Sequence, residues 1–253
     1  MSARLESVGL RSVYKATPAT VGGVRCKPDR AMTPAYITIH NTANPNADAR
    51  DHYNAQTKGH LGSMQMAVHY YVDDGDTLYQ CLRDLEQGWH AGDGRGPGNS
   101  KSISIEVCEK TGSDQTKAEA HAAALVADLI IQRNIPVDHV VPHKHWTGKN
   151  CPHLILPHWE KFMAQVRYYV ALFEGKQPEA QPAGDARYMI RTTTETLNVR
   201  KGPGTNYPVT GQITGKGKDA YTIVAEADGP GAKRWGELLS GAGWIALDYT
   251  RRI

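Results

Sequence analysis

The stretch Tyr36-Ile-Thr-Ile-His-Asn-Thr-Ala-Asn44 decides the architecture of the first half of the chain. Apolar and polar side chains alternate through its first five residues, which predicts a short β-strand. The Asn-Thr-Ala-Asn run that follows is typical of a turn. We therefore expect His40 to project from a strand end, where the connecting segments often carry binding sites.

Working outward from this strand, residues 66–72 and 103–108 alternate in the same way and are also expected to be strands. Helical patterns lie between and after them, over residues 48–56, 116–133 and 159–172. Strands mixed with helices predict an α/β layer architecture for this part of the chain.

A stretch rich in Pro, Gly and polar residues, 174–186, has no hydrophobic period and is expected to be an interdomain linker. It separates a domain of residues 1–173 from a smaller domain of residues 187–253. The smaller domain carries short β-type runs between Gly, Pro, Asn and Asp turns, at residues 188–191, 197–200, 221–225 and 243–247. That spacing predicts a small all-β barrel.

The overall composition is that of an ordinary globular chain. Its 253 residues are 40% hydrophobic and 22% charged, with a formal net charge of +3. Such a charge is too weak to argue for nucleic acid, and no apolar run approaches the ~20 residues that span a bilayer. We therefore expect neither a nucleic-acid partner nor membrane insertion. The positive charge is concentrated after residue 186, where ten basic residues face six acidic ones.

Four cysteines in a chain of this length do not form a disulfide framework, and Cys26, Cys81 and Cys108 are expected to be small buried apolar groups. The fourth cysteine lies in the segment His143-Lys-His-Trp-Thr-Gly-Lys-Asn-Cys151.

A histidine and a cysteine joined by a short Gly-containing loop can meet at one metal ion, because imidazole and thiolate both suit zinc. His40 is the expected third ligand. Three protein ligands and one open position form the catalytic zinc pattern. The spacing leaves His143 and His145 as alternatives for the second ligand.

Three motifs carry a resemblance to a known family: Ile39-His-Asn-Thr42, the Gly-rich segment 92–108, and His143-x-x-Trp-Thr-Gly-Lys-x-Cys-Pro152. Together they resemble the zinc-dependent type 2 N-acetylmuramoyl-L-alanine amidases, of the kind found in phage endolysins and bacterial autolysins. The resemblance covers roughly residues 10–170. It implies a mixed central sheet flanked by helices and one zinc ion held by His40, His143 and Cys151.

The resemblance also implies the catalytic roles. Glu106 matches the acidic residue that acts as general base, and Lys149 matches the lysine two residues before the cysteine. Other branches carry a tyrosine near the position of Val68, and its absence here favours Glu106 as the base. We expect Asn41, Thr42, Trp89 and His90 to line the substrate cleft. Period-2 alternation places Glu106 on the same face as Ser104 and Cys108, opposite Ile103, Ile105 and Val107.

Residues 197–209 and the later Gly-Trp244-Ile resemble bacterial SH3-like domains, which act as cell-wall-targeting modules beside such amidases. A positively charged, aromatic-bearing domain tethered to a hydrolase raises its concentration at an anionic wall. The partners expected from this resemblance are peptidoglycan and anionic wall polymers. Four aromatic residues are expected to stack on a wall ligand: Tyr188, Tyr207, Trp235 and Trp244.

The sequence therefore predicts a peptidoglycan hydrolase that cleaves the amide between N-acetylmuramic acid and L-alanine of the stem peptide. An alternative is a recognition protein on the same scaffold that binds muropeptides without cutting them, which Cys151 disfavours. A zinc hydrolase of unrelated amides would leave the C-terminal domain unexplained. The first residues lack the features of a secretory signal. We therefore expect synthesis in the bacterial cytoplasm and release to the wall through a separate membrane pore.

Overall fold

The computed structural model describes residues 2–59, 66–176, 188–238, 240 and 242–253. The chain divides into two compact units, residues 1–176 and 177–253. Most of the predicted linker, 174–186, falls among residues 177–187, outside the described residues, and its character stays a prediction.

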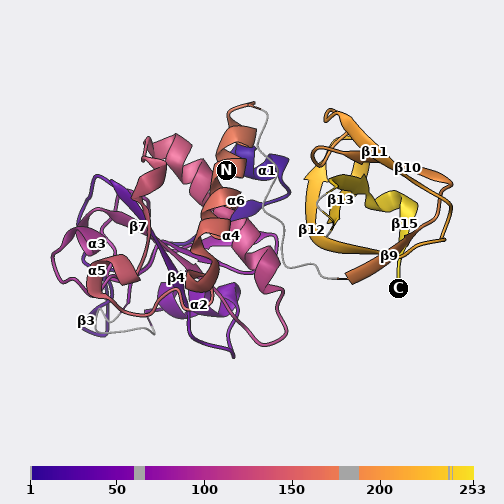
Figure 1. Ribbon diagram of the computed structural model, residues 1–253. Coiled ribbons are helices and arrows are strands. Elements are labelled where there is room, and N and C mark those ends of the chain that lie inside the picture. The colour runs from indigo at the N-terminus through magenta and orange to yellow at the C-terminus, as the bar shows by residue number, and fades with distance from the viewer. Residues whose placement is uncertain (1, 60–65, 177–187, 239, 241) are drawn as a thin grey trace. The chain divides into compact units, whose positions relative to one another are not determined.

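The N-terminal unit is built on a six-stranded sheet (Figure 1). β5 and β6 pair antiparallel, whereas the other neighbours pair parallel. The strands, in their order across the sheet, are β1 (Arg11–Tyr14), β6 (Thr77–Gln80), β5 (Tyr70–Val72), β7 (Ser102–Val107), β4 (Tyr36–Asn41) and β8 (Val140–Pro142). The predicted mixed central sheet is confirmed.

Each face of this sheet packs against helices. The main hydrophobic core joins one face to α4 (Gln115–Arg133), α6 (Trp159–Phe173) and α1 (Ala3–Ser7). α4 and α6 lie side by side (Figure 1). The other face carries α2 (Ala49–Thr57) over a smaller apolar cluster. With helices on both faces, the central strands are buried on both sides, as in other α/β layer folds.

Side-chain chemistry at the helix ends fixes where the longer helices begin and stop. The Asp114 carboxylate accepts the backbone N–H of Lys117 at the start of α4, and Asn134 ends that helix in the left-handed conformation at φ 52°. α2 begins with a capping box in which Asp48 and Asp51 bond each other's backbone N–H groups. The three helices predicted from periodicity are present and agree with the prediction within one residue at each end.

Short elements connect this framework: β2 (Thr20–Val21), β3 (Val24–Arg25), α3 (Pro97–Ser100), α5 (Lys144–Thr147) and the 3-10 helices η1 (Val137–His139) and η2 (Leu156–His158). Strands β1, β6 and β8 were not predicted. The strand expected over residues 66–72 is shorter, because only its last three residues join the sheet and Ala67 makes an isolated bridge to Trp89.

The C-terminal unit is all-β, as predicted, with a seven-stranded sheet in which every pairing is antiparallel. Its order is β11 (Val209–Thr214), β10 (Thr196–Arg200), β14 (Trp244–Ala246), β13 (Ala232–Leu238), β12 (Tyr221–Gly229), β9 (Tyr188–Thr192) and β15 (Thr250–Arg252), with η3 (Leu247–Tyr249) before the last strand. In the part of the chain that the structure describes, no helix has the length and apolar character needed to cross a bilayer.

Candidate metal centre

The candidate site lies where three neighbouring parallel strands end. His40 on β4 is in register with Glu106 on β7. Ile39 is in register with Pro142, the last residue of β8, so His143 follows at the level of His40. Because neighbouring residues in register point to the same face of a sheet, these side chains gather at one edge.

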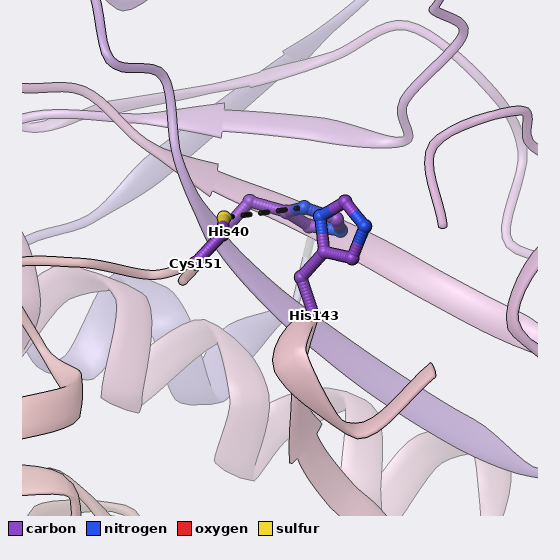
Figure 2. A group of neighbouring side chains, drawn as sticks. All are labelled: His40, His143 and Cys151. Atoms are coloured by element: carbon purple, nitrogen blue, oxygen red, sulfur yellow. Dashed lines mark hydrogen bonds between the residues drawn. The ribbon is translucent and has the colours of Figure 1, made fainter. Parts of the chain in front are cut away.

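His40, His143 and Cys151 converge (Figure 2), and one ligand atom from each lies within 4.8 Å of the other two. The Cys151 sulfur is 3.8 Å from His40 Nδ1. Tetrahedral zinc with bonds of ~2.1 Å to nitrogen and ~2.3 Å to sulfur requires a separation of about 3.6 Å. His145 is exposed and packs against the Trp146 ring. The geometry therefore favours His143 over His145 as the second ligand.

Each of the two imidazoles uses its Nε2 atom in a hydrogen bond outside the ligand set, which leaves Nδ1 as the nitrogen that can bind a metal ion. His143 Nε2 bonds the carbonyl oxygen of Ala91 at 3.0 Å, and His40 Nε2 bonds His90 Nδ1 at 3.1 Å. His143 Nδ1 is buried and has no hydrogen-bond partner among the described residues. In metal-binding histidines generally, a hydrogen bond on one ring nitrogen orients the other nitrogen towards the metal ion. The site therefore fits a metal ion on chemical grounds.

Burial sets the protonation of the three ligands. It lowers the pKa of His40 well below its usual value, and the neighbouring His90 and His143 lower it further. Burial also lowers the pKa of His143, so both rings are in the neutral form that binds metals. The pKa of the Cys151 thiol is raised to about 11 by burial. A divalent cation would favour the thiolate and release its proton.

Glu106 is a buried carboxyl group next to His40. Its Oε1 is 3.9 Å from His40 Nδ1, and its Oε2 has no hydrogen-bond partner in the described part of the chain. Burial raises its pKa to about 8, against an opposing effect of the Lys149 ammonium. The strand alternates as predicted, since the apolar residues of β7 enter the main core and Glu106 lies on the opposite face.

Lys149 lies in the turn that precedes Cys151, whose backbone N–H donates to the Lys149 carbonyl oxygen at 2.7 Å. The side chain is exposed, and its positive charge lowers the pKa of both His40 and Glu106. Lys149 therefore acts electrostatically on the site while its ammonium group remains in contact with solvent.

Two of the predicted cleft residues, Asn41 and Thr42, differ in their hydrogen bonds. Asn41 is buried and uses its amide within the protein, because Nδ2 donates to the Val107 carbonyl oxygen and Oδ1 accepts the Leu154 N–H. These two bonds link the segment after Cys151 to β7. The Thr42 hydroxyl is buried without a hydrogen-bond partner among the described residues.

His90 also differs from its predicted position in the cleft wall. It is buried behind His40, and Asn99 Oδ1 accepts its backbone N–H at 2.7 Å. A Cβ on Gly88 would lie 2.6 Å from the His90 ring, so only glycine allows this approach. The structure thus places His90 in contact with the candidate metal ligand His40, which it can orient, and the sequence did not indicate this contact. Trp89 is half-buried and lines a groove of about 340 Å³ with Arg30.

The four aromatic residues expected to bind the wall do not form one exposed surface. Trp235 and Trp244 are buried in the core of the C-terminal unit. Their rings are therefore not available to stack on a ligand, which corrects the prediction for these two. Tyr188 donates its hydroxyl to Glu226, and Tyr207 is half-buried against Gly202.

The comparisons with known proteins concern the N-terminal unit. A family model described as N-acetylmuramoyl-L-alanine amidase matches residues 30–154. The N-acetylmuramoyl-L-alanine amidase CwlH of Bacillus subtilis (strain 168) is 46% identical over 140 residues, which are 54% of this chain and 54% of that protein. XlyA of the same organism, with the same description, is 44% identical over 146 residues, 57% of this chain and 48% of that protein. The chain thus spans about half the length of these curated relatives.

Solved structures resemble the same region. The catalytic domain of XlyA has a TM-score of 0.57 and 42% sequence identity, and the similarity covers 62% of this chain and 99% of that domain. The structure of PlyL has a TM-score of 0.54 and 35% sequence identity, and the similarity covers 62% of this chain and 96% of that chain. Both similarities extend over nearly the whole of the compared domains.

Proposed function

The chain belongs to the N-acetylmuramoyl-L-alanine amidase family, and from this premise we propose that it hydrolyses the amide between N-acetylmuramic acid and L-alanine of the peptidoglycan stem peptide. The observation that carries the proposal is the convergence of His40, His143 and Cys151 beside the buried Glu106. Two neutral imidazoles, a thiol and a nearby carboxyl group are the parts that metal-assisted amide hydrolysis requires.

We propose one zinc ion as the cofactor, held by His40 Nδ1, His143 Nδ1 and the Cys151 sulfur. The mixed nitrogen and sulfur donor set suits zinc. Bound zinc supplies Lewis-acid polarisation and water activation at neutral pH. With three protein ligands, one position is left for water or the substrate.

Glu106 is proposed as the general base. Its Oε2 has no partner among the described residues and is free to accept a proton from the attacking water. Burial places its pKa at about 8, and a cation bound nearby would lower that value towards neutrality. The same carboxyl group then donates the proton to the leaving amine. General acid–base catalysis of this kind contributes typically ~10²–10⁴-fold to the rate.

Lys149 is proposed to stabilise the transition state. Its ammonium acts on the charges of the site, as its effect on the pKa of Glu106 indicates. When the amide carbon becomes tetrahedral, negative charge develops on its oxygen. A positive charge held beside that oxygen favours the transition state over the ground state.

The C-terminal unit is proposed to hold the enzyme at the bacterial cell wall, as its resemblance to SH3-like modules implies. Tethering a binding unit to a hydrolase raises the local concentration of the active site at an insoluble substrate. If the C-terminal unit binds the wall, the protein acts there.

The test of the proposed function compares Glu106→Gln with Glu160→Gln, a change at an exposed surface glutamate. Soluble muropeptides are incubated with each variant, and new free amino groups and product masses are measured. We expect Glu106→Gln to bind about one zinc per chain and to lose turnover, while Glu160→Gln keeps both. Normal hydrolysis by Glu106→Gln would refute the assigned base.

The competing function is recognition of muropeptides without cleavage. It predicts binding of the fragments by the zinc-loaded wild-type chain with no release of amino groups. The thiol at Cys151 favours hydrolysis, because it completes a three-ligand metal set that mere recognition does not need.

A further inference from the structure

Two arginines face each other on the outer surface of the C-terminal sheet. Arg191 on β9 and Arg251 on the edge strand β15 are in register, so their side chains leave the same face. The neighbouring residues Ile190 and Thr192 are buried, which places Arg191 on the outward side. Like charges directly opposite in a ladder destabilise a sheet unless something else compensates them.

Two lysines join this pair through the loop of residues 215–218. Arg191 Nη1 donates to the carbonyl oxygens of Gly217 and Lys218 at 2.8 and 2.9 Å, which holds the loop on β9. The backbone N–H of Gly217 also bonds the Thr192 hydroxyl. Lys216 and Lys218 are both exposed in this loop. We call Arg191, Lys216, Lys218 and Arg251 the basic cluster.

The acidic residues nearby do not neutralise the basic cluster. Glu195, Asp219 and Asp248 are carboxylates on the neighbouring segments. Glu195 accepts the backbone N–H of Lys216, and Asp248 accepts that of Lys233. No member of the basic cluster forms an ion pair with any residue that the structure describes. Glu226 and Asp228 are already engaged by Arg234. The four cations of the basic cluster outnumber these carboxylates, which leaves a local surplus of positive charge.

We propose that the basic cluster binds a phosphodiester polymer of the bacterial cell wall. The proposal rests on the proposed function, because the substrate of the N-terminal unit lies in the wall. A guanidinium group bonds phosphate oxygens with two parallel N–H groups, and lysines add attraction along a polyanion. Arg191 is held rigidly by the loop and retains N–H groups on its other nitrogens. Arg251, directly opposite, can contact the same phosphate or the next one.

The experiment uses the full chain and short incubations on ice with purified walls. The walls are used before and after their phosphodiester polymers are removed with hydrofluoric acid. The double variant K216Q/R251Q is compared with K201Q/K233Q, which removes the same charge from two exposed lysines outside the cluster. The bound fraction is measured at several salt concentrations, and amidase activity is measured separately on soluble muropeptides.

We expect the wild-type chain and K201Q/K233Q to bind intact walls alike, and to lose at least fivefold in affinity when the polymers are removed. K216Q/R251Q should lose about 25-fold in affinity for intact walls, with a weaker salt dependence, since each of the two basic side chains contributes about a fivefold factor in affinity near an anionic surface. Equal binding by the two double variants would overturn the inference.

Two further outcomes separate the possible failures. In the first, the wild-type chain binds polymer-free walls as tightly as intact walls, and K216Q/R251Q loses binding to duplex DNA. That result would assign the cluster to nucleic acid and overturn the proposal. Absence of activity on soluble muropeptides would instead refute the proposed function, whatever the walls show. Full activity of K216Q/R251Q on soluble muropeptides is expected, because the cluster lies outside the catalytic unit.

Discussion

Replacing Glu106 by Gln should stabilise the metal-free protein at alkaline pH. In the folded chain the Glu106 carboxyl is buried and one of its oxygens has no hydrogen-bond partner among the described residues. Ionising such a group inside the protein is costly, because water no longer solvates the charge. Gln keeps the shape of the side chain and carries no charge at any pH.

The size of the effect follows from the pKa of Glu106, which burial raises from 4.5 to about 8. Below pH 4.5 the group is protonated in both the folded and the unfolded chain, so the stability it contributes is fully present. Above pH 4.5 the unfolded chain ionises first, and this stability is lost until the folded group ionises near pH 8. At about 1.4 kcal/mol per pH unit, the interval corresponds to roughly 5 kcal/mol of unfolding free energy.

The assay is urea unfolding of the chelated protein between pH 4.5 and 9, followed by circular dichroism at 222 nm. This signal reports the N-terminal unit, because its long helices α4 and α6 dominate the helix content of the described residues. The difference between Glu106→Gln and wild type should be near zero at pH 4.5 and grow to several kcal/mol by pH 8. Glu160→Gln should show no such trend. A difference that is constant with pH would refute the reasoning.

Three further predictions concern the ligands and the scaffold. Zinc binding at pH 7 should release more than one proton per ion, because the Cys151 thiol and the Glu106 carboxyl are both mainly protonated in the metal-free protein while the two imidazoles are neutral. Calorimetry in buffers of different ionisation enthalpy measures this number, and a value near zero would contradict the reasoning. His90→Ala should weaken zinc binding by about 10–100-fold, because it removes the acceptor that orients His40, and His90→Gln should recover part of the loss. Competition with a chromophoric chelator measures the affinity. The control is His139→Ala, which should bind zinc normally, because His139 bonds the Ala35 carbonyl oxygen away from the site. Asp48→Ala should lower the unfolding free energy by about 1 kcal/mol, because it removes the α2 capping box. Urea unfolding measures this change, and unchanged stability would show that the cap is dispensable.

The longer helices could be predicted because their signals are local. α4 carries its own N-cap at Asp114 and its own left-handed stop at Asn134. Among the strands of the N-terminal unit that were not predicted, β1 and β8 have four and three residues, and each pairs with a segment distant in the sequence. The four-residue β6 pairs with the distant β1 and with the nearby β5. Nothing in four residues such as Arg11–Tyr14 specifies that partner.

The site was predictable to the extent that its residues lie in motifs. His40 and Cys151 stand in segments whose residue types indicate metal binding, whereas the role of Glu106 was implied only by the resemblance to the amidase family. The orientation of the ligands could not be predicted in this way, because it depends on contacts across the sheet. The Ala91 carbonyl oxygen that bonds His143 carries no side-chain signal, and His90 reads in the sequence as one polar residue in a Gly-rich loop.

The charges of the site explain why these buried groups belong together. Burial raises the pKa of both Cys151 and Glu106, so without a cation both are mainly protonated at neutral pH. A thiolate and a carboxylate together carry two negative charges, and one divalent ion balances them. The burial that makes each anion costly by itself therefore favours the state in which the cation and both anions are present. Lys149 is exposed and adds a positive charge beyond this balance, which supports its proposed action on the charge that develops in the substrate.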